Sequence, residues 1–275
     1  MNETDIIKNI LHNQRGIFQI GNTCFFDYMI QRPVNGKFNI GYIRDVPHLQ
    51  LLDGGFSKNK VEKYYSKHKK MVSQLDAFIT MTDSLASQIK NSYDIDKDYQ
   101  LFQNFPSWLE TPVQKRNEFV FIGARPIHPE FDEFFNQLES DSGLSVKTFY
   151  YLKGIGKRGV IKGFDYGSRY GLFVNITKFN QAFQCLPRKV LIYAMTGITP
   201  VVHSSFSETI SMLRKNNVEP IIYSTNAGDG IKEHSQNIIS TINKHVPTQI
   251  DRRKWCIETR IPELIQKIKQ LGGEK

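Results

Sequence analysis

The stretch QCLPRKVLIYAMTGITPVV, from Gln184 to Val202, predicts a helix, a tight stop and a buried strand. Pro187 suits the first helical position, and Gly197 suits the turn that ends a helix. Pro200 is tolerated at the start of the strand Thr199–His203, which is otherwise rich in β-branched residues. A helix that leads directly into a buried strand is the repeating unit of a parallel α/β sheet.

The first turn of this helix carries two positive charges, Arg188 and Lys189. Cations are disfavoured at a helix N-terminus, because the helix dipole is already positive there. A bound anion would reverse this effect, since the free N–H groups and both cations would then face a negative charge. The stretch therefore indicates an anion site, with a surface helix that exposes its basic side chains as the alternative.

The same alternation of short apolar strands and helices continues through most of the chain and predicts an α/β protein with parallel sheets. The predicted strands are 16–20, 38–43, 76–81, 99–104, 118–123, 144–151, 170–176, 199–203 and 220–224. The predicted helices are 61–72, 83–92, 131–138, 187–195, 208–215, 231–245 and 252–271.

One interruption predicts a domain boundary. The segment FPSWLETPVQKRN, residues 105–117, has two prolines and no apolar period, and a new strand follows it. We therefore expect a short first domain over residues 1–107, a linker over 108–117 and a second domain over 118–275 that includes the closing helix. The second domain is long enough for a complete nucleotide-binding α/β fold, whereas the first is short for one.

Composition narrows the class of protein. The chain has 275 residues, a net charge of +9 and three cysteines without metal-ligand spacing, which fits a reduced cytoplasmic protein. The beginning lacks the pattern of a signal peptide, and no apolar stretch approaches the roughly 20 residues of a membrane span. The positive charge indicates an acidic partner or a solvated basic surface.

The opening stretch resembles the donor-domain signature of GT-B-type glycosyltransferases, P-x-K-x-x-E-Y-x-x-x-G-x-P-V-V. The residues that match it are Pro187, Lys189, Tyr193, Gly197, Pro200, Val201 and Val202. Further segments, which resemble the same family in the expected order, are LDAFITMTDSLASQIKNSYDI, YQLFQNFPSW, FVFIGARP and RRKWCIETRIPELIQKI. The chain thus looks like a retaining-type or capsular-polysaccharide glycosyltransferase, with two Rossmann-like domains of which the N-terminal one is abbreviated.

The resemblance implies a donor site in the second domain. Lys189 would contact the diphosphate or the sugar, with Arg188 reinforcing its charge. Pro187 and Tyr193, which match the same signature, would also belong to the donor-binding residues. Arg125, after the turn at Gly123, would face the diphosphate, and Gln184 could bond a sugar hydroxyl. These cations would stabilise the departing nucleoside diphosphate without a metal ion or another cofactor.

Two departures from the family pattern favour a second interpretation. Ile192 stands where the family has Glu or Gln, and an isoleucine cannot hold the donor ribose. Only 37 residues precede Phe38, where relatives have several more strands and helices. The chain could have a minimised acceptor domain, be a fragment, or need a partner glycosyltransferase chain, with a non-catalytic subunit as the alternative function.

The segment FNIGYIRDVPHLQLL supplies the candidate acceptor-side residues. Asp45 follows a predicted strand, so it would project from the carboxyl edge of the sheet, where α/β proteins bind ligands. Asp45 could act as a general base on an acceptor hydroxyl in an inverting reaction, and His48 could replace it. The alternative is an aspartate that caps the next turn.

The segment SKNKVEKYYSKHKKMV, residues 57–72, predicts a basic helix that could bind an anionic membrane or be a solvated surface. No nucleic-acid motif accompanies it, so a nucleic-acid-binding module is a weaker alternative. The expected function is transfer of a sugar from a nucleotide sugar to a glycan or lipid-linked acceptor. The expected location is the cytoplasm or the inner face of the membrane.

Overall fold

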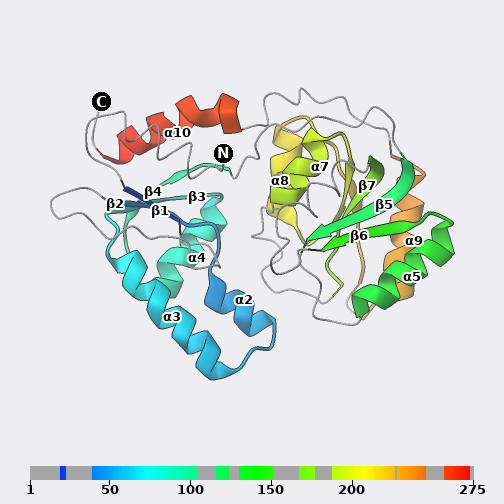
Figure 1. Ribbon diagram of the computed structural model, residues 1–275, viewed down its shortest axis with the longest axis horizontal. Helices are drawn as coiled ribbons and strands as arrows, with labels where there is room; N and C mark the ends of the chain where they lie inside the picture. The colour runs from blue at the N-terminus through cyan, green and yellow to red at the C-terminus, as the bar shows by residue number, and fades with distance from the viewer. Residues whose placement is uncertain are drawn as a thin grey trace. The chain divides into compact units, whose positions relative to one another are not determined.

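The computed structural model describes residues 19–22, 39–103, 116–123, 130–150, 167–176, 188–226, 228–245 and 257–272. Contacts divide the chain into two units, one formed by Met1–Ser107 with Ile257–Lys275 and the other by Trp108–Cys256. Both units are α/β, and each has one parallel sheet (Figure 1). The predicted fold class is thus confirmed at the level of a Rossmann-like parallel arrangement.

Among its described residues, the first unit has a four-stranded sheet in the order β1-β2-β3-β4. Its strands are β1 (Gln19–Asn22), β2 (Asn39–Tyr42), β3 (Ala77–Thr80) and β4 (Asp98–Leu101). Its helices are α2 (Pro47–Asp53), α3 (Lys58–Ser73), α4 (Asp83–Tyr93) and α10 (Ile257–Leu271). The helix α2 was not predicted, because two turns of helix are too short to show a clear apolar period.

The closing helix α10 covers one face of this first sheet. Leu264 and Ile268 of α10 pack on Ile40 and on Ala77 and Ile79, all of which are buried. Figure 1 shows α2, α3 and α4 on the opposite face. The prediction that residues 118–275 form one domain is therefore wrong for α10, whose apolar stripe fits the sheet of the first unit.

In the part of the second unit that the structure describes, five strands form a sheet in the order β6-β5-β7-β8-β9. Its strands are β5 (Arg116–Gly123), β6 (Val146–Tyr150), β7 (Ser168–Phe173), β8 (Thr199–His203) and β9 (Ile221–Tyr223). Its helices are α5 (Glu130–Ser142), α7 (Arg188–Met195), α8 (Ser207–Lys215) and α9 (Ile231–Ile242). The strand β5 begins inside the predicted linker 108–117, because Arg116 already pairs with Ser168.

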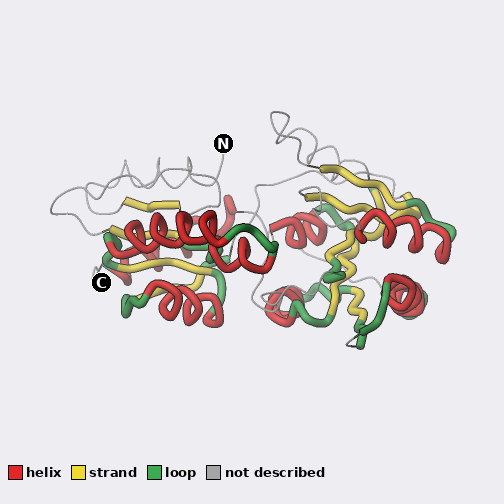
Figure 2. The backbone as a smooth tube through the Cα atoms, turned by 90° about the horizontal axis from the view of Figure 1, so that it is seen from below, coloured by secondary structure: helices red, strands yellow, loops and turns green. Residues whose placement is uncertain are grey.

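Alternation along β5 explains why helices cover both faces of this sheet. Phe119 and Phe121 belong to the core that contains α5 and α9, whereas Val120 and Ile122 pack with Tyr193 of α7. The perpendicular view again shows the strands of this unit between layers of helices (Figure 2). The chain leaves β5 for β6 on one side and then continues to β7 on the other. The carboxyl ends of β5 and β7 thus form the topological switch point, where open parallel sheets bind ligands.

Candidate functional site

Lys189 lies at this switch point. It belongs to the first turn of α7, and its Nζ is 4.6 Å from the ring centre of Phe121 and 5.1 Å from that of Phe173. A Cβ atom built on Gly123, the last residue of β5, would be 3.1 Å from the same Nζ. The structure therefore brings together Gly123 and Lys189, two of the predicted donor-site residues, and the absence of a side chain at Gly123 leaves room for the ammonium group.

Tyr193 has a different place from the predicted one. It is fully buried, and its hydroxyl oxygen accepts a hydrogen bond of 3.1 Å from the backbone N–H of Ile122. Its ring fills the space beside Gly171, where a built Cβ would be only 2.6 Å away. Tyr193 thus anchors α7 to β5 and β7, so it positions Lys189 one helical turn away and does not line a binding surface.

The carboxyl edge also holds a polar network that sequence reasoning missed. His203 at the end of β8 lies 2.7 Å from the hydroxyl of Ser205 and 3.0 Å from that of Thr225, which follows β9. The side-chain amide of Asn175, which follows β7, donates to Ser205 at 2.9 Å. The available signal was a polar residue after each of three successive strands.

The charge and tautomer of His203 follow from this geometry. Burial, with a smaller effect from His234, lowers the pKa of His203 to about 4, so the ring is neutral at physiological pH. The backbone N–H of Ser205 donates to Nδ1 at 3.2 Å, so we assign the ring proton to Nε2, which then donates to Thr225. The network is therefore polar but uncharged, next to the charged position at Lys189.

Two aromatic side chains connect these two parts of the edge. Phe173 contacts Lys189 on one side and packs on Phe206 at a ring distance of 4.1 Å. Phe206 is buried and directly precedes α8. The carboxyl edge thus presents an ammonium group, an aromatic pair and a neutral polar network in adjacent positions along the sheet.

In the first unit, Asp45 lies in the segment between β2 and α2, beyond the carboxyl end of the strand, as predicted. The side-chain amide of Gln50 donates to its Oδ1 at 3.1 Å. Burial raises the pKa of Asp45 above its ordinary value, although Arg44 and the bond from Gln50 act in the opposite direction. A carboxylate with a raised pKa is a better proton acceptor near neutral pH.

His48 is enclosed by helices. It is only 7% exposed, and its ring meets those of Tyr65 and Tyr93 edge-on at 5.0 and 5.5 Å. Burial lowers its pKa, with a smaller opposing effect from Glu62. The structure thus places the predicted alternative base inside the packing of α2, α3 and α4, apart from the strand edge that Asp45 occupies.

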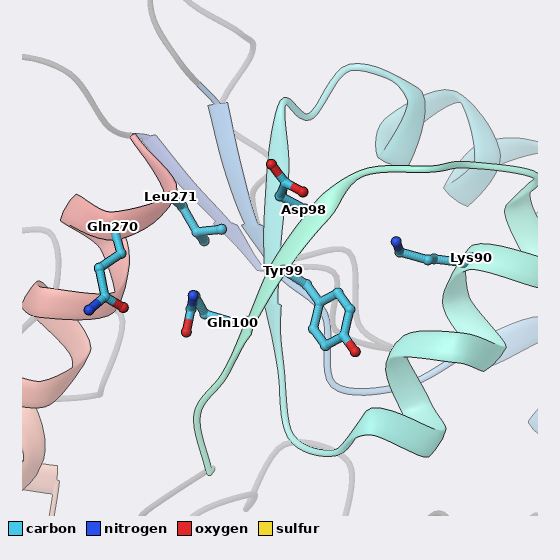
Figure 3. A pocket seen from close by; sticks show the side chains of 6 residues that line it. All are labelled: Lys90, Asp98, Tyr99, Gln100, Gln270 and Leu271. Carbon is cyan, nitrogen blue, oxygen red and sulfur yellow. The ribbon is translucent and has the colours of Figure 1, made fainter. Parts of the chain in front are cut away.

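A separate pocket of about 280 Å³ lies on the first unit, over the edge strand β4 (Figure 3). It is lined by Lys90, Asp98, Tyr99, Gln100, Gln270 and Leu271. Asp98 is the first residue of β4, so the pocket begins at the amino end of this parallel sheet. Ligand sites of such sheets lie at the carboxyl end, and none of the predicted site residues lines this pocket.

Other predicted residues lie outside the described part of the chain. Arg125, Gln184 and Pro187 are among them, and of Arg188 the structure describes the backbone, which begins α7. Among the described residues, no group of three or more histidine, cysteine, aspartate or glutamate side chains is arranged to hold a metal ion. Within the same ranges, no helix has both the length and the hydrophobicity to cross a membrane.

Comparison with known proteins gives no family: no protein-family model and no curated protein matches this chain.

Proposed function

We propose that the chain is a glycosyltransferase of GT-B type that moves a sugar from a nucleotide-sugar donor to a glycan or lipid-linked acceptor. The observation that carries the proposal is the place of Lys189, whose ammonium group lies beside Gly123 at the switch point of the second sheet. A cation at that position suits a diphosphate. The surrounding stretch resembles the donor-domain signature of GT-B-type glycosyltransferases, and this resemblance is the reason for proposing a nucleotide sugar as the donor.

In the proposed reaction, an acceptor hydroxyl oxygen forms a bond to the anomeric carbon of the sugar. The bond between that carbon and the donor's phosphate oxygen breaks, and the nucleoside diphosphate leaves with the bonding electrons. Negative charge therefore grows on the diphosphate in the transition state. Lys189 and the N-terminal N–H groups of α7 would stabilise this charge without a metal ion.

Asp45 would take the proton of the acceptor hydroxyl in an inverting reaction. Its raised pKa and its place beyond the carboxyl end of β2 favour this role over His48, which is enclosed between Tyr65 and Tyr93. Gln50 would fix the orientation of the carboxylate through its hydrogen bond.

Lys189→Met tests the donor site, because it keeps much of the side-chain stem and removes the charge. Hydrogen bonds from charged groups contribute about 1.5–3 kcal/mol, so we expect the dissociation constant for uridine or guanosine diphosphate to rise roughly 10- to 100-fold. Isothermal titration calorimetry would measure it, with Lys215→Met, an exposed lysine that ends α8, as the control. Unchanged affinity in the Lys189 variant, with both proteins folded, would remove the basis of the proposal.

A second candidate function is a non-catalytic subunit of the same type. Its support is Ile192, which packs against the cluster of Val120, Ile122, Tyr193 and Ile198 instead of offering a polar group. A donor would then bind without a side-chain contact from this position to its ribose. Binding of a nucleotide sugar without transfer, until a partner chain is added, would favour this candidate.

A further inference from the structure

Four lysines form one face of α3. Lys60, Lys63, Lys67 and Lys70 follow one another at spacings of three and four residues, so they lie on the same side of the helix. All four are exposed, whereas Val61, His68 and Val72 are buried on the side that packs on the unit. The one acidic residue of α3, Glu62, lies off this face. We refer to these four residues as the lysine face.

An exposed apolar residue lies just before α3, at the end of the preceding helix α2. Leu52, in the last turn of α2, is 54% exposed and is the large hydrophobic side chain that stands out on the surface of the described residues. The turn between the helices is ordered by hydrogen bonds of 3.0 Å from Gly55 to Leu52 and from Phe56 to Leu51. Lys60 covers the ring of Phe56 at 3.9 Å, so the apolar turn adjoins the lysine face.

The aromatic residues of α3 are partly buried and pack on other rings of the unit. Tyr65 stacks on Tyr93 at 6.2 Å and meets His48 edge-on, and Tyr64 meets the buried His68 at 5.9 Å. Both rings thus already pack on aromatic neighbours within the unit, Tyr64 on His68 and Tyr65 on Tyr93. Single-stranded nucleic acid is bound through stacked bases as well as charge, whereas a lipid surface needs positive charge and an apolar group at the interface.

We infer that the lysine face and the turn at Leu52 dock on an anionic phospholipid surface. The lysines would lie over the negative headgroups, and Leu52 would enter the boundary between headgroups and acyl chains. Figure 1 shows that α2 and α3 lie on the opposite side of the first sheet from α10, so they form the outer layer of that face. This inference rests on the charges and exposure of the first unit and does not require the proposed function.

Vesicle sedimentation tests the inference with a matched pair of variants. Lys60→Gln/Lys63→Gln removes two charges from the face, and Lys58→Gln/Lys69→Gln removes two from elsewhere on the same helix. A lysine near an anionic surface contributes about 1 kcal/mol, so the first pair should weaken binding to phosphatidylglycerol-containing vesicles roughly thirtyfold. The second pair should bind much like the unmodified chain. Equal losses in the two double variants, or no binding to anionic vesicles, would overturn the inference.

Leu52→Trp gives an independent readout of insertion. The emission of the introduced tryptophan is obtained by subtracting the spectrum of the unmodified chain from that of the variant. This difference spectrum should shift to the blue with anionic vesicles and stay unchanged with vesicles of pure phosphatidylcholine. A different result would show that the lysine face binds nucleic acid and that the inference is wrong. In that case the chain binds single-stranded RNA, the Lys60→Gln/Lys63→Gln variant loses this binding, and the fluorescence of the Leu52→Trp variant does not shift on vesicles. Lys189→Met should still bind the vesicles, which separates this test from that of the donor site.

Discussion

Gly171 sets how closely α7 approaches the second sheet. The ring of Tyr193 occupies the space that a side chain at position 171 would need, and the Tyr193 hydroxyl is bonded to the backbone of Ile122. Lys189 lies one helical turn before Tyr193, so the same contacts fix the backbone position from which its side chain extends. Gly171, a residue in the core of the sheet, therefore helps to set where the helix that carries Lys189 lies.

We predict that Gly171→Ala destabilises the protein by about 1–3 kcal/mol, because the added methyl group overlaps the buried Tyr193 ring. Urea unfolding would measure the change. Tyr193→Leu should recover part of the lost stability when combined with Gly171→Ala, since the smaller side chain leaves room. Additive effects of the two substitutions would show that the two residues do not interact.

The sequence could predict the place and role of some site residues but not of others. Gly123 and Lys189 were each predicted as donor-site residues, and they lie together because a strand end and a helix start meet at the same edge of a parallel sheet. Tyr193 was predicted as a ligand contact, although its spacing from Val190 and Ala194 puts it on the apolar face of the helix. The network of Asn175, His203 and Thr225 was missed, because its members are distant in sequence and match no motif.

The sequence predicted the helices and strands better than it predicted which of them pack together. Every predicted strand has a counterpart in the described part of the chain, and β8 has the predicted bounds, because β-branched runs between turns are a strong local signal. A closing helix was also predicted, over 252–271, and the apolar residues of α10 recur in an amphipathic pattern. That pattern shows which side of a helix is buried, but it does not show which sheet buries it, and α10 was assigned to the wrong unit.

Leu264→Ala tests this assignment of α10. The buried leucine packs on the first sheet, and a Leu-to-Ala change in a core costs about 2–5 kcal/mol. Hydrogen exchange should speed up at the buried amides of β2 and β3 more than at those of β7 and β8. Gln266→Ala, an exposed change in the same helix, should leave both sets unaffected. Faster exchange confined to the second unit would contradict the assignment.

At the scale of the whole molecule, stability should depend on pH through buried histidines, among which His68 and His203 have the largest shifts. Burial is the main cause that lowers the pKa of His68 and of His203 to about 4. An unfolded histidine titrates near 6.5, so between roughly pH 6.5 and 4 the unfolded chain binds protons that the native chain does not. The free energy of unfolding should therefore fall as the pH falls, by on the order of 3 kcal/mol for each histidine.

Urea unfolding at several pH values between about 7.5 and 4.5 would measure this slope. His203→Gln should reduce the slope by removing one titrating group, while His68 and the other buried histidines still contribute. Asp45 acts in the opposite direction, because its raised pKa means that the native chain binds a proton more readily than the unfolded one. A slope that is the same with and without His203 would show that its ring is not held neutral in the folded state.

The return of α10 to the first sheet has a consequence for the order of folding. Ile40 and Leu264 belong to one core although more than two hundred residues separate them in the chain. During synthesis, the whole second unit leaves the ribosome before the helix that covers the first sheet. The first unit must therefore wait with an apolar face uncovered while the second can already fold. This long-range closure should make the first unit the slower to mature and the more dependent on chaperones.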